Sequence, residues 1–272
     1  MANFLGQFAI NRGHPLCQGL VYAGLGRHPG ARHYHDSSLF RKDGTRIGTG
    51  TSIWVPGPHF WAQDFNGTDD YINVQGMTTQ PVNDLTFSFW FAPDVSGVIK
   101  FAGKMVDGFT DGWFLYLSSS AAYFYIDASS ANVYTTSLGL TAGTWHNLVV
   151  RKRYADSYAE MFLDGASISV ITPTAKANTP LDSTADLNIG RKVGTLGGYW
   201  NGKAGDVRVY DKPLTAAEIG ELFYDPGSIV LQPRKSVFFP EAAGGRIMGS
   251  LVGEGGLAGP GGIAGIAGGI AG

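Results

Sequence analysis

The sequence predicts an all-β protein built as an antiparallel jelly-roll β-sandwich. Short runs with β-strand patterning follow one another from Leu85 to Asp211, and turn residues (Gly, Asn, Asp or Ser) divide them. No helical pattern separates these runs, which favours antiparallel pairing over a parallel α/β sheet. Glycine supplies 40 of the 272 residues, about twice its usual share, so many turns are expected.

The clearest strand covers residues 85–93. Leu85 and every second residue up to Phe91 are large and apolar, whereas the residues between them are mixed. Because successive side chains of a strand point to opposite faces, this alternation predicts one core-facing side. Further strands are predicted over 97–104, 112–118, 121–127, 132–137, 145–153, 158–164, 167–172, 185–190 and 203–211.

One short helix is predicted from about residue 216 to 224. Thr215 and Glu218 form a capping-box pattern, in which each side chain accepts a hydrogen bond from the backbone N–H of the other residue. An apolar stripe at helical spacing runs from Ile219 to Phe223, and Pro226 with Gly227 ends the helix.

The last segment, residues 253–272, differs in kind from the rest. Glycine recurs there at every third position, at Gly253, Gly256, Gly259, Gly262, Gly265 and Gly268. A three-residue glycine period is typical of chains that pack against one another along a crowded axis, and a flexible Gly/Ala linker is the alternative. We expect this tail to drive homo-oligomerisation into a trimer or a larger symmetric assembly.

Composition excludes several classes of partner. The formal net charge is −2 and no block of Lys and Arg occurs, so nucleic acid is not an expected ligand. Cys17 is the only cysteine, which excludes an intramolecular disulfide and a thiolate zinc site. No run of apolar residues is long enough to span a membrane. The segment from Met1 to Cys17 lacks the basic head and apolar run of a secretory signal.

A series of motifs gives the chain a family resemblance. Asp64 to Tyr71 contains Phe, Gly, Asp and Tyr; Thr144 to Val149 is a Trp-His pair followed by apolar residues; and Met161 to Gly165 is an apolar run ending in Asp-Gly. Together with Leu187 to Gly190 and Gly205 to Tyr210, and in this order, they resemble the laminin-G-like family of concanavalin A-type jelly rolls. The likeness covers about residues 20–224 and implies that fold.

A second resemblance is narrower. Ile10 to Leu16 with Gly19 to Val21, and a proline-containing arm after the last helix, are similar to laminin-G-like proteins encoded by bacteriophages. This likeness implies a virion component: a capsid decoration, head fibre or tail appendage in contact with other virion proteins. The missing export signal fits a protein of the virion surface, because virions assemble in the host cytoplasm.

The sequence therefore divides into four parts. Residues 1–19 form an N-terminal arm, 20–224 the laminin-G-like domain, 225–252 an extended linker arm, and 253–272 the glycine-rich tail.

The sequence offers no convincing catalytic centre. Retaining glycoside hydrolysis needs two carboxylates about 5 Å apart on one face. Glu160 is the only glutamate on a predicted strand, and Asp69 and Asp70 are adjacent, so on a strand they would point to opposite faces. We therefore expect no enzyme and no required cofactor, although the concanavalin A-type fold also hosts glycan hydrolases and lyases.

The family resemblance implies a structural calcium ion, for which Asp36 and Asp206 are the candidate carboxylate ligands. The alternative is that Asp36 forms an Asx-turn with Ser38 and that Asp206 pairs with a nearby basic group.

Aromatic side chains are the candidate glycan ligands. Trp113, Tyr116, Tyr125 and Trp200 offer flat apolar faces with a polar edge, which suits stacking on a sugar ring. The alternative is that these residues fill the core or cover a sheet. Our leading hypothesis is thus a non-enzymatic virion surface protein that oligomerises through its tail. A glycan-binding adhesin for host attachment is the second hypothesis, and a carbohydrate-active enzyme is the third.

Overall fold

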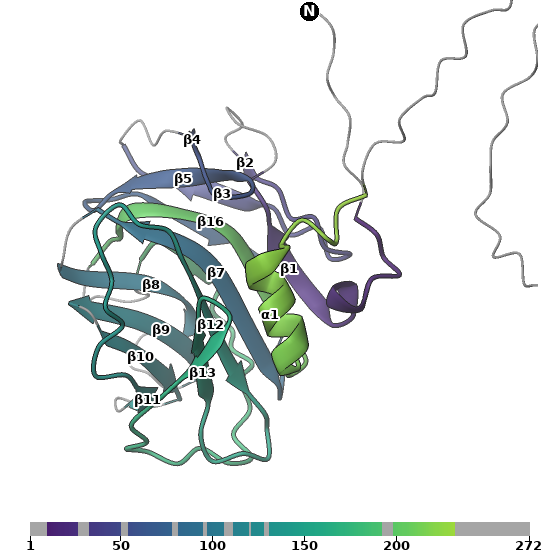
Figure 1. Ribbon diagram of the computed structural model, residues 1–272, viewed down its shortest axis with the longest axis vertical. Helices are drawn as coiled ribbons and strands as arrows, with labels where there is room; N and C mark the ends of the chain where they lie inside the picture. The colour runs from purple at the N-terminus through teal and green to yellow at the C-terminus, as the bar shows by residue number, and fades with distance from the viewer. Residues whose placement is uncertain are drawn as a thin grey trace, which may run out of the picture. The chain divides into compact units, whose positions relative to one another are not determined.

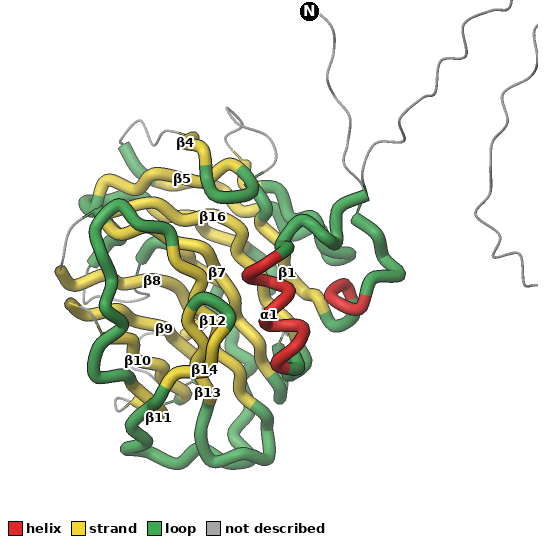
Figure 2. The backbone as a smooth tube through the Cα atoms, viewed as in Figure 1, coloured by secondary structure: helices red, strands yellow, loops and turns green. Residues whose placement is uncertain are grey.

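The computed structural model describes residues 10–26, 33–49, 54–77, 81–94, 97–105, 111–119, 121–127, 131–191 and 198–231. Over these residues the chain forms two antiparallel sheets packed face to face, with one α-helix against the outside of the first sheet (Figures 1 and 2). The predicted jelly-roll sandwich is confirmed. No described helix is long and apolar enough to cross a membrane.

The first sheet has the strand order β14-β13-β12-β7-β16-β5-β4, and β1 also pairs with β16. Its strands are β1 (Leu20–Gly24), β4 (Trp54–Pro56), β5 (Trp61–Asn66), β7 (Leu85–Pro93), β12 (His146–Lys152), β13 (Glu160–Leu163), β14 (Ala166–Ile168) and β16 (Asn201–Tyr210).

The second sheet has the order β11-β10-β9-β8-β15-β6-β3-β2. Strands far apart in the sequence lie side by side in it, because β15 pairs with both β6 and β8. Its strands are β2 (His33–Tyr34), β3 (Gly44–Ile47), β6 (Tyr71–Val74), β8 (Gly97–Met105), β9 (Gly112–Ser119), β10 (Ala121–Ile126), β11 (Ala131–Tyr134) and β15 (Leu187–Ile189).

The main core lies between the sheets and is rich in aromatic rings. Phe87 and Phe91 of β7 are fully buried, as the alternation predicts. The ring of Phe87 lies 5.1 Å from that of Trp113, and the ring of Phe91 lies 5.8 Å from that of Trp200, both between centroids. Each large apolar side chain buried in this way contributes roughly 1.5–3 kcal/mol.

A second, smaller core lies under the helix α1 (Ala216–Tyr224). Ile219 and Leu222 pack there against Val149 of β12 and Tyr210 of β16, and Leu16 of the 3-10 turn η1 (Pro15–Cys17) joins them. The predicted helix and its capping box are confirmed. Because this core covers the first sheet from outside, β7 is buried on both faces.

Both described ends of the domain leave it together. The backbone N–H of Asn11 donates to the carbonyl oxygen of Ile229 at 2.8 Å, and Ile10 forms an isolated bridge with Val230. The two segments run next to each other beside α1 in Figure 1. The tail glycines from Gly253 to Gly268 and most of the linker arm lie outside the described residues.

Candidate functional site

The outer face of the second sheet carries a group of tyrosines that we call the tyrosine platform: Tyr116 of β9, Tyr123 and Tyr125 of β10, and Tyr134 of β11. Their sequence neighbours point the other way. Trp113, Leu115 and Leu117 of β9 lie in the core between the sheets, as do Phe124 and Ile126 of β10. Strand alternation therefore sorts the aromatic residues into a buried set and a partly exposed set.

Strand pairing brings the platform rings together. Tyr123 faces Tyr116 on one side and Tyr134 on the other. Its ring centroid lies 5.6 Å from that of Tyr116 and 5.2 Å from that of Tyr134, and the second pair is stacked. All four tyrosines are partly exposed. The result is a row of aromatic rings across three strands.

Phe114 lies beside this row and supports it. Its ring is 6.3 Å from that of Tyr116 and 6.2 Å from that of Tyr125, and only 3% of the residue is exposed. Burial and the neighbouring phenols of Tyr116 and Tyr123 raise the pKa of Tyr125. The Tyr125 hydroxyl therefore stays protonated at neutral pH and can both donate and accept hydrogen bonds.

Polar side chains continue the same face. Phe114 pairs with Gly103 of β8, Gly103 with Asn188 of β15, and Asn188 with Asn73 of β6. A side chain at position 103 would not fit, because a Cβ there would come within 2.9 Å of the Phe114 ring. The Asn73 Nδ2 lies 3.4 Å from the Oδ1 of Asn188. Aromatic rings and side-chain amides thus share one surface, as they do in many sugar sites.

Two predicted glycan ligands are corrected by the structure. Trp113 and Trp200 are both fully buried, so neither presents a face to a ligand. The alternation with Leu115 and Leu117 placed Trp113 on the core side, and this signal was available in the sequence. Tyr116 and Tyr125, by contrast, are partly exposed on one face, and both rings neighbour Phe114. Their role as ligands stays a prediction.

Asp36 is occupied by donors of the protein itself. Its carboxylate accepts hydrogen bonds from the backbone N–H groups of Ala23, Ser38 and Lys42, at 2.8–2.9 Å, and from the Ser38 hydroxyl at 2.7 Å. This is the Asx-turn alternative, and it fastens the loop after β2 to β1. A calcium ion does not fit a carboxylate whose oxygens already accept these four bonds.

Asp206 is the partner of a buried arginine. Its two carboxylate oxygens accept from the Nε and one terminal nitrogen of Arg208 at 2.6 and 2.8 Å, and both side chains are buried. Burial alone would lower the pKa of the Arg208 guanidinium. The neighbouring Asp206 carboxylate outweighs this effect, and the pKa of Arg208 lies above its usual value. No group of three His, Cys, Asp or Glu residues in the described ranges is placed to hold a metal ion.

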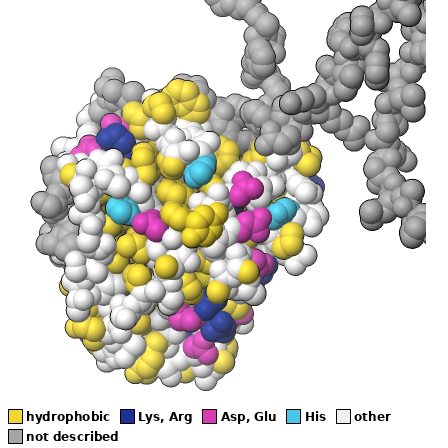
Figure 3. Space-filling model, in the orientation of Figure 1, with side chains coloured by type: hydrophobic (Ala, Val, Ile, Leu, Met, Phe, Trp, Pro, Cys, Tyr) yellow, Lys and Arg dark blue, Asp and Glu magenta, His cyan; other side chains and the backbone are white. Residues whose placement is uncertain are grey.

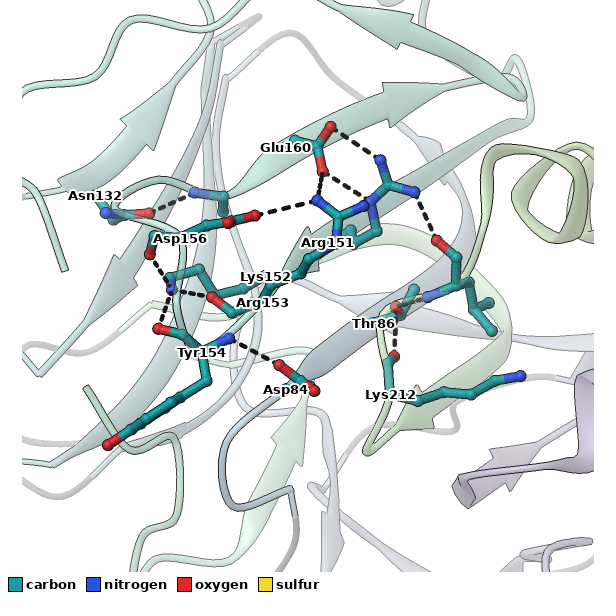
Figure 4. Close-up of polar contacts among 12 residues, drawn as sticks. Asp84, Thr86, Asn132, Arg151, Lys152, Arg153, Tyr154, Asp156, Glu160 and Lys212 are labelled. Atoms are coloured by element: carbon teal, nitrogen blue, oxygen red, sulfur yellow. Dashed lines mark hydrogen bonds and ion pairs between the residues drawn. The ribbon is translucent and has the colours of Figure 1, made fainter. Parts of the chain in front are cut away.

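Glu160 of β13 is held by two arginines (Figure 4). The Glu160 carboxylate accepts from the Nε of Arg151 at 2.8 Å and from Arg153 at 3.2 Å. The hydrogen bond from Arg151 is the main reason that the pKa of Glu160 lies below its usual value. A general acid needs the opposite shift. Arg151 also donates to the Leu214 carbonyl, so this network ties α1 to β12.

The outer face of the first sheet differs from the platform face. Trp90 is stacked on Phe223 of α1 with centroids 5.4 Å apart and is only 6% exposed, whereas Tyr224 is 79% exposed. Figure 3 shows hydrophobic side chains in the middle of this face, with histidine and acidic groups around them. Trp90 thus packs against the helix, whereas the platform tyrosines pack against one another.

Solved structures with the same fold come from proteins of several kinds. A mutant sialidase of Trypanosoma rangeli that displays trans-sialidase activity matches 84% of this chain with 17% identity and a TM-score of 0.59. Domain 4 of AbnA, an extracellular arabinanase of Geobacillus stearothermophilus in complex with arabinotriose, matches 74% with 17% identity and a TM-score of 0.53. The binding domain of botulinum neurotoxin DC in complex with rat synaptotagmin II matches 75% with 12% identity and a TM-score of 0.56.

The three matched structures differ in how much of their own length this chain covers. This chain spans 37% of the sialidase and 51% of the toxin domain, but 98% of the arabinanase domain. At such identities the likeness shows the fold. No curated protein sequence matches the chain. A family model described as the concanavalin A-like lectin/glucanases superfamily matches residues 66–220, more than half of the chain, and the protein belongs to this laminin-G-like family.

Proposed function

We propose that this protein is a non-enzymatic glycan-binding protein that stacks sugar rings on its tyrosine platform. The observation that carries the proposal is the placement of Tyr116, Tyr123, Tyr125 and Tyr134 on one partly exposed face, while the other large aromatics of β9 and β10 fill the core or lie beneath them. The arabinanase domain whose structure contains arabinotriose supports the proposal, because this chain spans almost all of that domain.

The chemistry suits a sugar better than a fully apolar ligand. A pyranose ring has an apolar C–H face and a rim of hydroxyl groups. The tyrosine rings meet the C–H face, while their hydroxyls and the amides of Asn73 and Asn188 hydrogen-bond to the rim. The proposal includes no catalytic step: the Asp186 carboxylate beside these amides accepts hydrogen bonds from the Asn73 amide at 3.4 Å and from the Gly76 N–H at 3.3 Å.

An open platform of this size predicts weak binding by a single copy. Stacking gains are offset by the loss of translational and rotational freedom, so millimolar to micromolar dissociation constants are expected. Several linked copies increase the avidity by a factor of 10² or more. Oligomerisation through the glycine-period tail, which the sequence predicts, is therefore part of the proposed function.

We place the protein on a virion surface, as the resemblance of its N-terminal motif implies. The segments next to the two described ends, which contain Asn11 and Ile229, lie side by side next to α1. Attachment at that point leaves the outer face of the second sheet available for a glycan. Locating the chain in an electron-microscopy map of its parent particle tests this setting. A position inside the particle, away from any surface, would contradict it.

The binding proposal is tested on a glycan array with the full chain. We expect wild type to bind at least one oligosaccharide, and Tyr116→Ala and Tyr125→Ala each to weaken that binding by about tenfold. Tyr224→Ala is the control, because it removes a tyrosine ring from α1 that is 79% exposed and lies outside the platform. Binding that survives both platform substitutions, or no binding by wild type, would overturn the proposal. Release of product from the bound glycan would overturn its non-enzymatic part.

A further inference from the structure

We propose that Arg191 makes this face selective for glycans that carry a carboxylate. The inference rests on the proposed glycan binding and adds the chemical class of the ligand. Arg191 follows β15, and within the ranges that the structure describes no carboxylate pairs with it.

The backbone around Arg191 is fixed from the core. Arg191 forms an isolated antiparallel bridge with Tyr199. The backbone N–H of Trp200, which follows Tyr199, donates to the carbonyl oxygen of Gly190 at 2.7 Å. Trp200 is fully buried against Phe91. The buried indole thus anchors the two segments that carry Arg191 and Tyr199.

The Arg191 side chain is held by aromatic stacking. Its guanidinium carbon lies 4.1 Å from the ring centroid of Tyr71, and the Tyr71 ring lies 6.2 Å from that of Tyr199. Tyr71 and Asn73 alternate with the core residues Ile72 and Val74, which places both on the outer face of the second sheet. The cation therefore lies on the same face as the platform.

This guanidinium differs from the other partly or fully buried ones. Among the described residues, Arg46, Arg151 and Arg208 each pair with a carboxylate. In the part of the chain that the structure describes, Arg191 makes no such pair, and its buried Nε has no hydrogen-bond partner there. A stacked guanidinium keeps its planar fork of N–H donors free at the edge. A carboxylate fills that fork with two parallel charge-assisted hydrogen bonds, which neutral hydroxyl groups cannot reproduce.

The distance to the platform suits one short oligosaccharide. Tyr71 lies on β6 and Tyr116 on β9, three strand spacings apart in the order β6-β15-β8-β9. At about 4.8 Å per spacing this is ~14 Å across the sheet. On β8, Lys100 pairs with Tyr116, and Gly103 pairs with Phe114 and Asn188 in the neighbouring row. A uronic or nonulosonic acid residue at Arg191 can therefore belong to the same ligand whose neighbouring rings stack on the tyrosines.

The test compares acidic probes with their neutral counterparts on the full chain. Trigalacturonate is paired with its methyl ester, and sialyllactose with lactose, so that the two kinds of acid are distinguished. We expect at least one acid to bind about tenfold more tightly than its neutral counterpart. Arg191→Gln is expected to abolish this preference, so that the acid and its neutral counterpart bind equally. Arg191→Lys keeps the positive charge but loses the planar fork of donors, so this variant is expected to retain only part of the preference for the acid. Arg12→Gln, an equal loss of charge on an exposed residue, is the control.

The outcomes separate the two proposals. Equal binding of acidic and neutral probes through the tyrosines would overturn the role of Arg191 and leave glycan binding intact. A preference for acids that survives Arg191→Gln would do the same. No binding of any probe or array glycan by wild type would overturn both.

Discussion

Trp113 and Tyr116 lie on the same strand, β9, and on opposite faces of it. The Trp113 ring packs 5.1 Å from Phe87 in the core, and the Tyr116 ring packs 5.6 Å from Tyr123 on the outer face. Two aromatic residues three positions apart thus have different physical roles. One stabilises the sandwich, and the other forms part of the proposed binding surface.

The first prediction follows from this difference. Trp113→Ala removes a fully buried ring from the core and is expected to lower the free energy of unfolding by about 3–5 kcal/mol. Tyr116→Ala removes a partly exposed ring and is expected to lower it by about 1 kcal/mol. Urea unfolding of the two variants measures both values. Equal losses would contradict the assignment of the two faces.

A second prediction concerns calcium and Asp206. Asp206→Asn leaves the buried Arg208 without a charged partner, so we expect a loss of roughly 3 kcal/mol in the free energy of unfolding. Asn is the suitable substitute because residue 206 has a positive φ of 44°, which Asn tolerates. The loss should be the same in calcium and in EDTA. A melting temperature of wild type that rises by several degrees with calcium, and a variant that no longer responds, would contradict this account.

A third prediction concerns the pH dependence of stability. Lys104 is fully buried, its ammonium group donates to the Met77 carbonyl, and burial lowers its pKa to about 8. An unfolded lysine titrates near 10.4. Between these values the unfolded state holds the proton that the folded state has released, so stability rises with pH, by at most about 1.4 kcal/mol per pH unit. Below pH 8 both states are protonated and this gain is absent.

Comparison with a variant isolates this effect. Urea unfolding at pH 7.5 and 9.5 should show a larger rise in stability for wild type than for Lys104→Met. Lys152, whose pKa burial also lowers, contributes equally to both proteins. Parallel pH profiles would show that Lys104 does not titrate in this window.

A fourth prediction addresses the tail. If the glycine period from Gly253 to Gly268 joins identical chains, the full protein has a mass in solution that is a multiple of 28.9 kDa. A version ending at Pro240 should then be a monomer. Analytical ultracentrifugation compares the two, and a monomer in both cases would reject assembly through the tail.

Local signals in the sequence were sufficient for part of this fold. The capping box at Thr215 and Glu218 marked the start of α1, and the alternation in residues 85–93 gave β7 with its core side. The strands before Leu85 were not predicted one by one, because several have only two to four residues and show no clear alternation. Pairing within the sheet defines them.

The candidate site was predicted less completely. Tyr116 and Tyr125 were identified as aromatic residues on predicted strands. Trp113 was included wrongly although its alternation with Leu115 and Leu117 indicated the core side, and Trp200 was included wrongly because it precedes the predicted strand 203–211, so no alternation indicated its side. Asn73 and Asn188 were missed, because they meet only when β6 and β15 pair across 115 residues of sequence. A single sequence holds no local signal for that contact.

The most direct measurement is fluorine NMR of the full chain with every tyrosine replaced by fluorotyrosine, titrated with the strongest glycan from the array. We expect the resonances of Tyr116, Tyr123, Tyr125 and Tyr134 to shift together with one dissociation constant, while the resonance of the exposed Tyr224 of α1 does not shift. Shifts confined to tyrosines outside the platform would contradict it.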